Sequence, residues 1–407
     1  MILKFSVTNF ESIKAPVVFD LGCTALKENE ESGAMKITAP NGASYKKICA
    51  LFGANASGKS NFITAIYTMA NLVRDSAALT PEDPLFYDPF LLDQSSKDEP
   101  TAFSIELSLN GIRYFYSFSY RSHQILTEKL QYAPKNYTIL VFERKGESYE
   151  FGNDGKTLSP LVKRTSANKL FLGTASAFNY EPCLALFHFF ANDLIVDFQN
   201  RIFRSDAGQN LFNAIADQLV KDEAFRAFSL SFLQAADLNI SSLHPRLLAA
   251  GTGDPSVYSR GKNDYTLIVG HQIGGAEYDL PLEDESDGTQ SVLFLSYFYY
   301  QAMKGEKVLI VDELDQSLHT LLLPFLVKTF AQVCPKSQFV FTTHDPTIMR
   351  ECSLRRDEFY FAEKGDDGAT SLFPLSDFSV RKNAKIEEEY LQGRFGAVPL
   401  IKDGFLS

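Results

Sequence analysis

The residues best suited to chemistry lie in one eight-residue stretch near the start of the chain. It fits the nucleotide-phosphate loop at every fixed position, and its glycines let successive backbone N–H groups point inward around an anion. The helix that should follow adds the positive end of its dipole. The lysine can reach the β- and γ-phosphates, and the serine after it can ligate Mg²⁺. The stretch predicts binding of ATP or GTP by Gly53, Asn55, Ala56, Ser57, Gly58, Lys59, Ser60 and Asn61.

Two elements must position this loop. Residues 46–52 are an apolar run that predicts a strand leading in, and residues 61–73 carry apolar side chains at helical spacing. Strand, glycine loop and helix is the order that the motif requires. The plainer interpretation is a chance glycine–lysine turn, and the flanking elements argue against it.

A second chemical cluster follows the apolar run 308–311, which ends in Asp312 and Glu313. Asp312 would hold Mg²⁺ through its water shell, completing the shell that Ser60 begins. Glu313 would polarise an attacking water, because phosphoryl transfer depends on positioning and charge compensation. A strand that simply ends in solvated acids is the alternative, and the phosphate loop upstream favours the metal site.

A further apolar strand, 339–343, ends in His344. Histidines at strand ends are more often structural, and that interpretation is preferred for His123, His188, His244 and His271. His344 differs because it follows the Asp312 strand and helix, where the nucleotide edge of a parallel sheet is expected. We therefore predict that it contacts the γ-phosphate.

The order of these motifs identifies a class. Phosphate loop, Ser-x-Gly turn (285–290), Asp-Glu strand and His strand is the order of ABC-type ATPases, so the chain resembles the ABC-like branch of AAA-family ATPases. That branch contains OLD-family, SMC-like and repair ATPases. The opening KFSVTNFESIK looks like its first strand. The stretch 389–399 is similar to the ending of small bacterial ATPases of abortive-infection and other phage-defence operons.

The resemblance implies an α/β fold: an ABC-type ATPase head with a mixed parallel sheet, an antiparallel β subdomain and a helical insertion. It also implies that Ser286 and Gly288 contact the γ-phosphate bound by the opposite subunit. Asp315 and Ser317 would cross the dimer interface, and His344 would be the switch histidine. Gly288 at a helix start offers an N–H to an anion, and Ser286 adds a hydroxyl. Two ATP molecules would be sandwiched in a homodimer or a higher assembly of dimers.

Some features depart from the family pattern. The Mg²⁺-sensing glutamine has no clear counterpart, since Gln94 lies in the right interval without a motif around it. Glu285 stands where the family usually has leucine before the signature serine. No zinc-hook cysteine pair or long coiled-coil arm is expected, and so few residues follow Pro399 that a fused OLD-type nuclease is not expected either.

The chain divides by pattern into three segments. Residues 1–160 predict an N-terminal ATPase lobe, with two paired strands at the start and a period-2 antiparallel sheet over 101–151. Residues 161–262 predict a mainly helical insertion. Residues 263–407 alternate strand and helix, which predicts parallel strands in a C-terminal ATPase lobe.

Composition and net charge limit the classes of function that the chain can have. A net charge of −11 over 407 residues argues against a surface that coats nucleic acid. Five scattered cysteines without a C-x-x-C pair indicate reduced thiols, and no apolar run is long enough to span a membrane, so a cytoplasmic protein without a membrane partner is expected. DNA stays possible through a local basic patch of Lys163, Arg164, Lys169, Arg201 and Arg204.

The leading hypothesis is an ATPase that converts ATP and water to ADP and phosphate and regulates a separately encoded effector, a nuclease or toxin, in antiphage defence. The alternative is an SMC-like or repair ATPase that clamps duplex DNA, which salt-dependent DNA binding would favour. A transporter's nucleotide-binding subunit is disfavoured by the long β-rich section.

Overall fold

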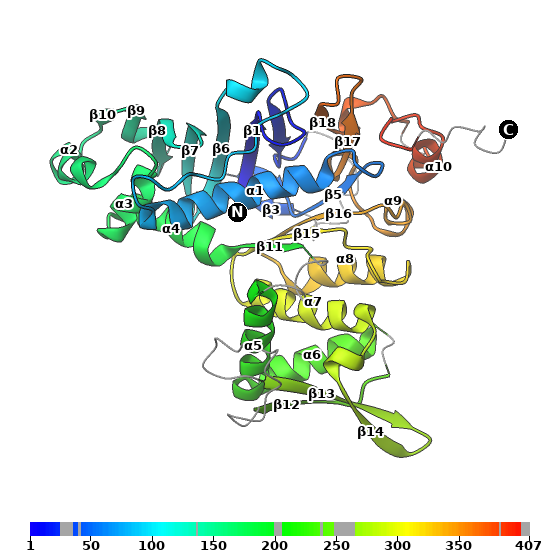
Figure 1. Cartoon of the computed structure of the whole chain (residues 1–407). Coiled ribbons are helices and arrows are strands. Elements are labelled where there is room, and N and C mark those ends of the chain that lie inside the picture. The colour runs from blue at the N-terminus through cyan, green and yellow to red at the C-terminus, as the bar shows by residue number, and fades with distance from the viewer. Residues whose placement is uncertain are drawn as a thin grey trace. The chain divides into compact units, whose positions relative to one another are not determined.

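The computed structural model describes residues 1–24, 36–39, 42–135, 137–198, 206–236, 239–247, 265–381 and 384–399. The chain forms two compact units (Figure 1), the first from 1–196, 306–312 and 337–407 and the second from 197–305 and 313–336. Sheets with parallel strands, an antiparallel sheet and several helices confirm the predicted α/β class. The boundaries of the two compact units differ from those of the three predicted segments, and the segments remain a prediction.

The first unit contains an antiparallel sheet built largely from the N-terminal third of the chain. The aromatic residues of one strand, Tyr114, Tyr116, Phe118 and Tyr120, alternate as predicted and are all buried. Turn-forming residues at Gly111 and at residues 122–123 predict hairpins, and the strands reverse at both places. The strand order is β10 (Ser148–Phe151), β9 (Ile139–Lys145), β8 (Gln124–Ala133), β7 (Ile112–Arg121), β6 (Thr101–Leu109), β1 (Ile2–Thr8) and β2 (Val17–Asp20).

A second sheet carries the predicted phosphate-loop strand at its centre. Strand β5 pairs in parallel with β16 on one side and β17 on the other, and β15 lies parallel to β16. Every residue of β5, β15 and β16 is buried, as expected for strands covered on both faces. The order is β11 (Leu194–Phe198), β15 (Val308–Asp312), β16 (Gln338–Thr342), β5 (Ile48–Phe52), β17 (Phe359–Lys364) and β18 (Thr370–Pro374).

Helix α1 (Lys59–Asp75) packs between these two sheets (Figure 1). Its Phe62 ring lies 5.8 Å from the ring of Phe5 in β1 and 5.4 Å from that of Phe19 in β2. The helix begins two residues earlier than predicted, so Lys59 stands in its first turn. The shorter helices of this unit are α2 (Gly155–Leu158), α3 (Phe171–Ala177), α4 (Glu181–His188), α9 (Ile348–Glu351) and α10 (Ile386–Leu391).

The stretch 389–399 packs against the strands that carry the phosphate loop. The Tyr390 ring lies 5.7 Å from Phe52 and 5.4 Å from Phe361, and the Phe395 ring lies 5.7 Å from Phe361. Because Phe52 directly precedes Gly53, this late segment buries the residue from which the loop departs.

The second unit is a helical core with a small sheet. Helix α7 is central: its Tyr300 ring lies 5.0 Å from Phe225 in α6, and its Tyr299 ring lies 5.2 Å from Phe330 in α8. The helices are α5 (Asp206–Lys221), α6 (Glu223–Ala235), α7 (Asp287–Lys304) and α8 (Leu322–Val333), and the antiparallel strands are β12 (Ser242–Leu247), β13 (Tyr265–Ile273) and β14 (Ala276–Pro281).

Three local predictions are wrong. The polar, glycine-bearing stretch 27–44 predicts a loop, but part of it pairs as β3 (Lys36–Thr38) with β4 (Ser44–Lys46), because Tyr45 packs against Leu3. The apolar spacing that continues to residue 198 is typical of a helix, but residues 194–198 form the strand β11, which the two adjacent β-branched residues in this stretch favour. The apolar spacing over 318–333 predicts a helix, but helix α8 begins only at Leu322.

The glycine-rich stretch 246–262 lies mostly outside the described residues. No helix in the described part of the chain combines the length and apolar character that crossing a membrane requires.

Candidate functional site

The phosphate loop joins β5 to α1, and two of its glycines are required by close neighbours. A Cβ on Gly53 would lie 2.5 Å from the Ala362 carbonyl oxygen of β17. Gly58 has a φ of 98°, and a Cβ there would lie 2.0 Å from Thr370 Oγ1 of β18. No side chain could enter either space, so the loop curls tightly against the β17–β18 hairpin.

Lys59 is folded over this loop. Its ammonium donates to the carbonyl oxygens of Gly53 at 2.9 Å and Ala54 at 3.1 Å, and the residue is only 5% exposed. Ser57 is buried as well, and its Oγ has no hydrogen-bond partner among the described residues. A buried cation and an unsatisfied buried hydroxyl in a loop of this shape fit a site that exchanges internal contacts for an anionic ligand.

The remaining loop residues differ in exposure. Asn55 and Ala56 are exposed, and Ala56 has a φ of 62°. Ser60 is half-buried in the first turn of α1. Asn61 turns its amide to Ser12, with Nδ2 donating to Ser12 Oγ at 2.9 Å.

Asp312 ends β15 beside the end of β16. Thr342 Oγ1 donates to Asp312 Oδ1 at 2.6 Å, and both residues are buried. Because β15, β16 and β5 are parallel neighbours, their carboxyl ends meet at one edge, where the phosphate loop also begins. The structure therefore places an oriented carboxylate at the sheet edge that carries Lys59, which is the arrangement a Mg²⁺–phosphate site uses.

His344 follows β16 at the same edge and is exposed. The residue before it, Thr343, donates its backbone N–H to the Leu51 carbonyl at 3.0 Å, which fixes the chain beside β5. Two residues on, Asp345 receives the Thr347 N–H on Oδ1 at 2.9 Å, while its buried Oδ2 has no partner in the described residues.

Glu313 and Asp315 belong to the turn after β15, in the second unit, whereas Asp312 belongs to the first unit. Glu313 is half-buried with a φ of 53°, a backbone conformation that glutamate rarely adopts and that often marks a functional position. The turn is closed by the Gln316 N–H, which donates to the Glu313 carbonyl at 2.9 Å.

Ser286 and Gly288 open α7 in the same unit. Ser286 is the exposed N-cap, and its Oγ accepts the Thr289 N–H at 3.1 Å. A Cβ on Gly288 would lie 2.6 Å from the Ser317 carbonyl oxygen, so the helix start touches the turn that also carries Asp315. His271 supports the approach to the helix, because its Nε2 lies 2.6 Å from Glu285 Oε1.

The predicted residues therefore fall into two groups. The phosphate loop, Asp312 and His344 share the first unit, and Ser286, Gly288, Glu313 and Asp315 share the second.

Sequence reasoning missed three residues that hold the first group: Ser12, Thr342 and Thr370. Thr342 could have been found, because the register of parallel strands sets the end of β16 beside Asp312. Ser12 and Thr370 had no signal, since β17 and β18 were not predicted.

The remaining candidate residues, Gln94 and the basic residues proposed to bind DNA, have little structural support. Gln94 is exposed, and its Oε1 accepts a hydrogen bond from Lys97 Nζ at 3.5 Å, three residues along the chain. Of the proposed DNA-binding cations, Lys169 donates to the Ala77 carbonyl at 3.0 Å and Arg164 lies 5.1 Å from the centre of the Phe178 ring. Arg201 and Arg204 lie outside the described residues.

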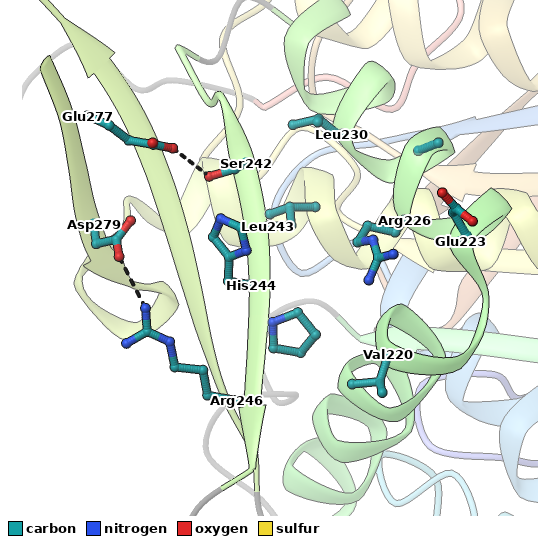
Figure 2. A pocket seen from close by; sticks show the side chains of 12 residues that line it. Val220, Glu223, Arg226, Leu230, Ser242, Leu243, His244, Arg246, Glu277 and Asp279 are labelled. Carbon is teal, nitrogen blue, oxygen red and sulfur yellow. Dashed lines mark hydrogen bonds and ion pairs between the residues drawn. The ribbon is translucent and has the colours of Figure 1, made fainter.

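Figure 2 shows a groove of about 790 Å³ in the second unit, between α6 and β12. It carries charges of both signs: Arg246 pairs with Asp279 at 3.2 Å, and the Glu277 carboxylate accepts a hydrogen bond from the Ser242 hydroxyl at 3.0 Å. None of the predicted site residues lines it. A groove of balanced charge is poorly suited to phosphate or DNA.

One protein-family model matches most of the chain. Residues 48–350 match a family model described as "AAA domain, putative AbiEii toxin, Type IV TA system". A stretch of 76 residues is 34% identical to the Septu protein PtuA of Bacillus mycoides (strain KBAB4). That stretch covers 17% of this chain and 11% of the length of PtuA.

Solved structures with a distant likeness are SMC heads. A Smc head bound to the C-winged helix domain of ScpA has 12% identity and a TM-score of 0.48, covering 92% of this chain and 97% of that one. The SMC head domain from Thermotoga maritima has 15% identity and a TM-score of 0.43, covering 92% and 98%.

Proposed function

Because the chain belongs to the AbiEii-type family of AAA domains, we propose that it binds ATP with Mg²⁺ and hydrolyses it to ADP and phosphate. One observation carries this proposal. The phosphate loop with Lys59 and the Asp312–Thr342 pair stand at the carboxyl edge of one sheet, within one compact unit.

The residues present fit this ligand. Lys59 would exchange the Gly53 and Ala54 carbonyls for phosphate oxygens, and the loop N–H groups would surround the phosphates. The Ser60 hydroxyl and the Asp312 carboxylate are oxygen donors of the kind that Mg²⁺ prefers. Bound Mg²⁺ would neutralise charge on the phosphates. Glu313 is the proposed base that orients water, and His344 the proposed γ-phosphate contact.

The second group suits a role across a dimer. Ser286 is exposed at a helix start, and Gly288 lies against the turn that carries Asp315 and Ser317. We propose that these residues complete the ATP site of another copy, so that two chains enclose two nucleotides. A homodimer, or a higher assembly of dimers, would be the active form.

The biological role proposed is regulation in antiphage defence. Its support is the AbiEii-type family and the local similarity to a Septu protein. A separately encoded effector, a nuclease or toxin, would be the partner, and the pair would work in the cytoplasm. ATP binding and hydrolysis would set when the effector acts.

The chemical test uses Glu313→Gln, which should keep ATP bound and hold the dimer. Native mass measurement with ATP and Mg²⁺ should show a dimer for Glu313→Gln, a transient dimer for the parent and a monomer for Lys59→Ala. Parent-rate hydrolysis by Glu313→Gln would remove Glu313 as the base.

The biological test uses phage plating. Protection should require this gene together with its neighbouring effector gene and should disappear with Lys59→Ala. Full protection by this chain alone would contradict the partner proposal.

A further inference from the structure

A row of hydrogen-bonded side chains connects elements that are far apart in the sequence to the phosphate loop. Asn61 Nδ2 donates to Ser12 Oγ at 2.9 Å, Ser12 Oγ lies 2.8 Å from Thr370 Oγ1, and Thr370 Oγ1 donates to the Ser57 carbonyl at 2.9 Å. Thr370 is 5% exposed, and its N–H also donates to the Ser12 carbonyl at 2.7 Å. The row therefore joins α1, the loop after β1 and the start of β18 to one peptide of the phosphate loop.

The chemistry of the acceptor fixes the direction of each bond. The Ser57 carbonyl can only accept, so the single hydroxyl hydrogen of Thr370 is used there. Ser12 must then donate to Thr370, while it accepts from the Asn61 amide. Each group in the row is a donor to the next, an arrangement in which hydrogen bonds strengthen one another.

The last hydrogen bond of the row, from Thr370 to the Ser57 carbonyl, sets the orientation of the Ser57–Gly58 peptide. In a trans peptide the C=O and the next N–H point in opposite directions, and the described chain contains no cis peptide. With the Ser57 carbonyl held at the back by Thr370, the Gly58 N–H is turned to the other side of the loop. Loops of this kind bind an anion with backbone N–H groups on their concave side.

The close approach of Thr370 explains why a glycine follows Ser57. The space for a Cβ on Gly58 is occupied by Thr370 Oγ1 at 2.0 Å and Ser12 Oγ at 2.8 Å. Gly58, with its φ of 98°, lets the two hydroxyls reach the backbone. Any larger residue would displace the row.

We propose that Thr370, supported by Ser12, is a positioning residue for nucleotide binding: it holds the Ser57–Gly58 peptide so that the Gly58 N–H faces the phosphates. Thr370 does not touch the ligand itself. The proposal rests on the proposed ATP site, and it adds that affinity depends on a hydroxyl that lies about 310 residues later in the chain (Ser57 to Thr370).

The test compares Thr370→Val, which keeps the shape and removes the hydroxyl, with Thr370→Ser, which keeps the hydroxyl. Calorimetric titration with ADP should show the dissociation constant raised about 5-fold for Thr370→Val and restored to within about 2-fold by Thr370→Ser, since one hydrogen bond is worth about 1 kcal/mol and 1.4 kcal/mol is tenfold. Ser12→Ala should show a smaller rise, of about 3-fold, because it acts through Thr370.

Turnover gives a second readout. A peptide N–H that contacts the phosphate in the ground state and the transition state alike changes KM and leaves kcat unchanged. Thr370→Val should therefore raise KM for ATP at constant kcat. The matched control is Ser371→Ala, which removes a neighbouring hydroxyl that donates to Glu363 within the β17–β18 hairpin.

The outcomes separate the two proposals. If the parent binds no ADP or ATP, the proposed function fails and this inference fails with it. If the parent binds and Thr370→Val binds equally well, only the positioning role is overturned. Equal losses of affinity and melting temperature in Thr370→Val and Thr370→Ser would also overturn it, because a packing role does not distinguish the hydroxyl.

Discussion

The start of helix α7 lies against the turn after β15: a Cβ on Gly288 would lie 2.6 Å from the Ser317 carbonyl oxygen. Ser317 has a φ of 58°, and the turn that contains it also carries Asp315. The two elements proposed to face a second subunit are thus in van der Waals contact within one chain. A change at Gly288 should move both.

Gly288→Ala tests this contact. In an ordinary helix turn alanine is favoured over glycine by about 1 kcal/mol, but here the added methyl must push the Ser317 carbonyl aside. We expect ADP affinity to stay within about 2-fold and ATP-dependent dimerisation to weaken by about 10-fold or more, by analogy with overpacking costs of about 1–3 kcal/mol. Analytical ultracentrifugation with ATP and Mg²⁺ measures the second quantity.

The control for that change is Asp287→Ala, at the exposed neighbouring position of the same helix turn. It should leave dimerisation near the parent value. A Gly288→Ala protein that dimerises as well as the parent and melts higher would show that the contact with Ser317 constrains nothing.

Thr342→Val should raise the Mg²⁺ concentration needed for ATP hydrolysis. The valine keeps the shape of the side chain but removes the 2.6 Å hydrogen bond to Asp312 Oδ1. Loss of such a supporting bond typically costs about 10–100-fold in metal affinity. Hydrolysis measured over a Mg²⁺ titration gives the half-saturating concentration.

Thr342→Ser retains the donor and should titrate like the parent. The same half-saturating Mg²⁺ in all three proteins would mean that Thr342 does not orient Asp312 for a metal.

Lys59→Ala should abolish nucleotide binding while leaving the fold intact. Charge-assisted hydrogen bonds are worth about 1.5–3 kcal/mol each, so a loss of about 100-fold or more in ADP affinity is expected. Calorimetry measures affinity and circular dichroism the fold. Lys163→Ala, at an exposed lysine of the same unit, is the control. ADP affinity within about 3-fold of the parent would place the phosphates elsewhere.

Glu358 makes the stability of the protein depend on pH. The residue is fully buried, Oε2 accepts the Arg355 N–H at 2.5 Å and Oε1 has no partner among the described groups. Burial raises the pKa of the carboxyl from 4.5 to about 8. Between those values the folded state holds a proton that the unfolded state has lost, so stability falls as the pH rises through this window, by up to about 1.4 kcal/mol per pH unit.

Glu358→Gln keeps the shape and removes the titration. The difference in unfolding free energy between variant and parent should therefore grow in favour of the variant from pH 5 to pH 8, measured by urea unfolding. Asp357 does not interfere, because the Arg355 guanidinium helps keep the pKa of that carboxyl below 3.8. Glu147→Gln, at an exposed position, should show no such trend. A pH-independent difference for Glu358→Gln would show that Glu358 is charged in the fold.

Local patterns predicted the elements that carry the phosphate loop. Five consecutive apolar residues before Gly53 are typical of a short covered strand, and Phe62, Ile66, Met69 and Val73 repeat at helical spacing and are buried in α1. The pairing of β1 with β2 and the hairpins around Gly111 followed from alternation and turn residues in the same way. These signals are local, and they need no knowledge of distant partners.

What could not be predicted depends on distant partners. Thr370 looks like an ordinary threonine after a glycine turn, and only the fold brings it to the Ser57 carbonyl. The strand β11 lies in a stretch of helical spacing, where its β-branched pair and its pairing with β15 at the edge of the sheet outweigh the helical pattern. Ser286 was predicted to contact phosphate. Its hydrogen bond to the Thr289 N–H could not be predicted, because it depends on where α7 begins.

The position of β5 between β16 and β17 has a consequence for synthesis of the protein. The ribosome makes the phosphate loop among the first sixty residues, yet the strands on either side of β5 emerge only after residue 338 and residue 359. Until then β5 is a fully apolar segment without its sheet neighbours, and such segments fold late and aggregate readily. Nascent chains released early should therefore be unable to hold nucleotide and should depend on chaperones.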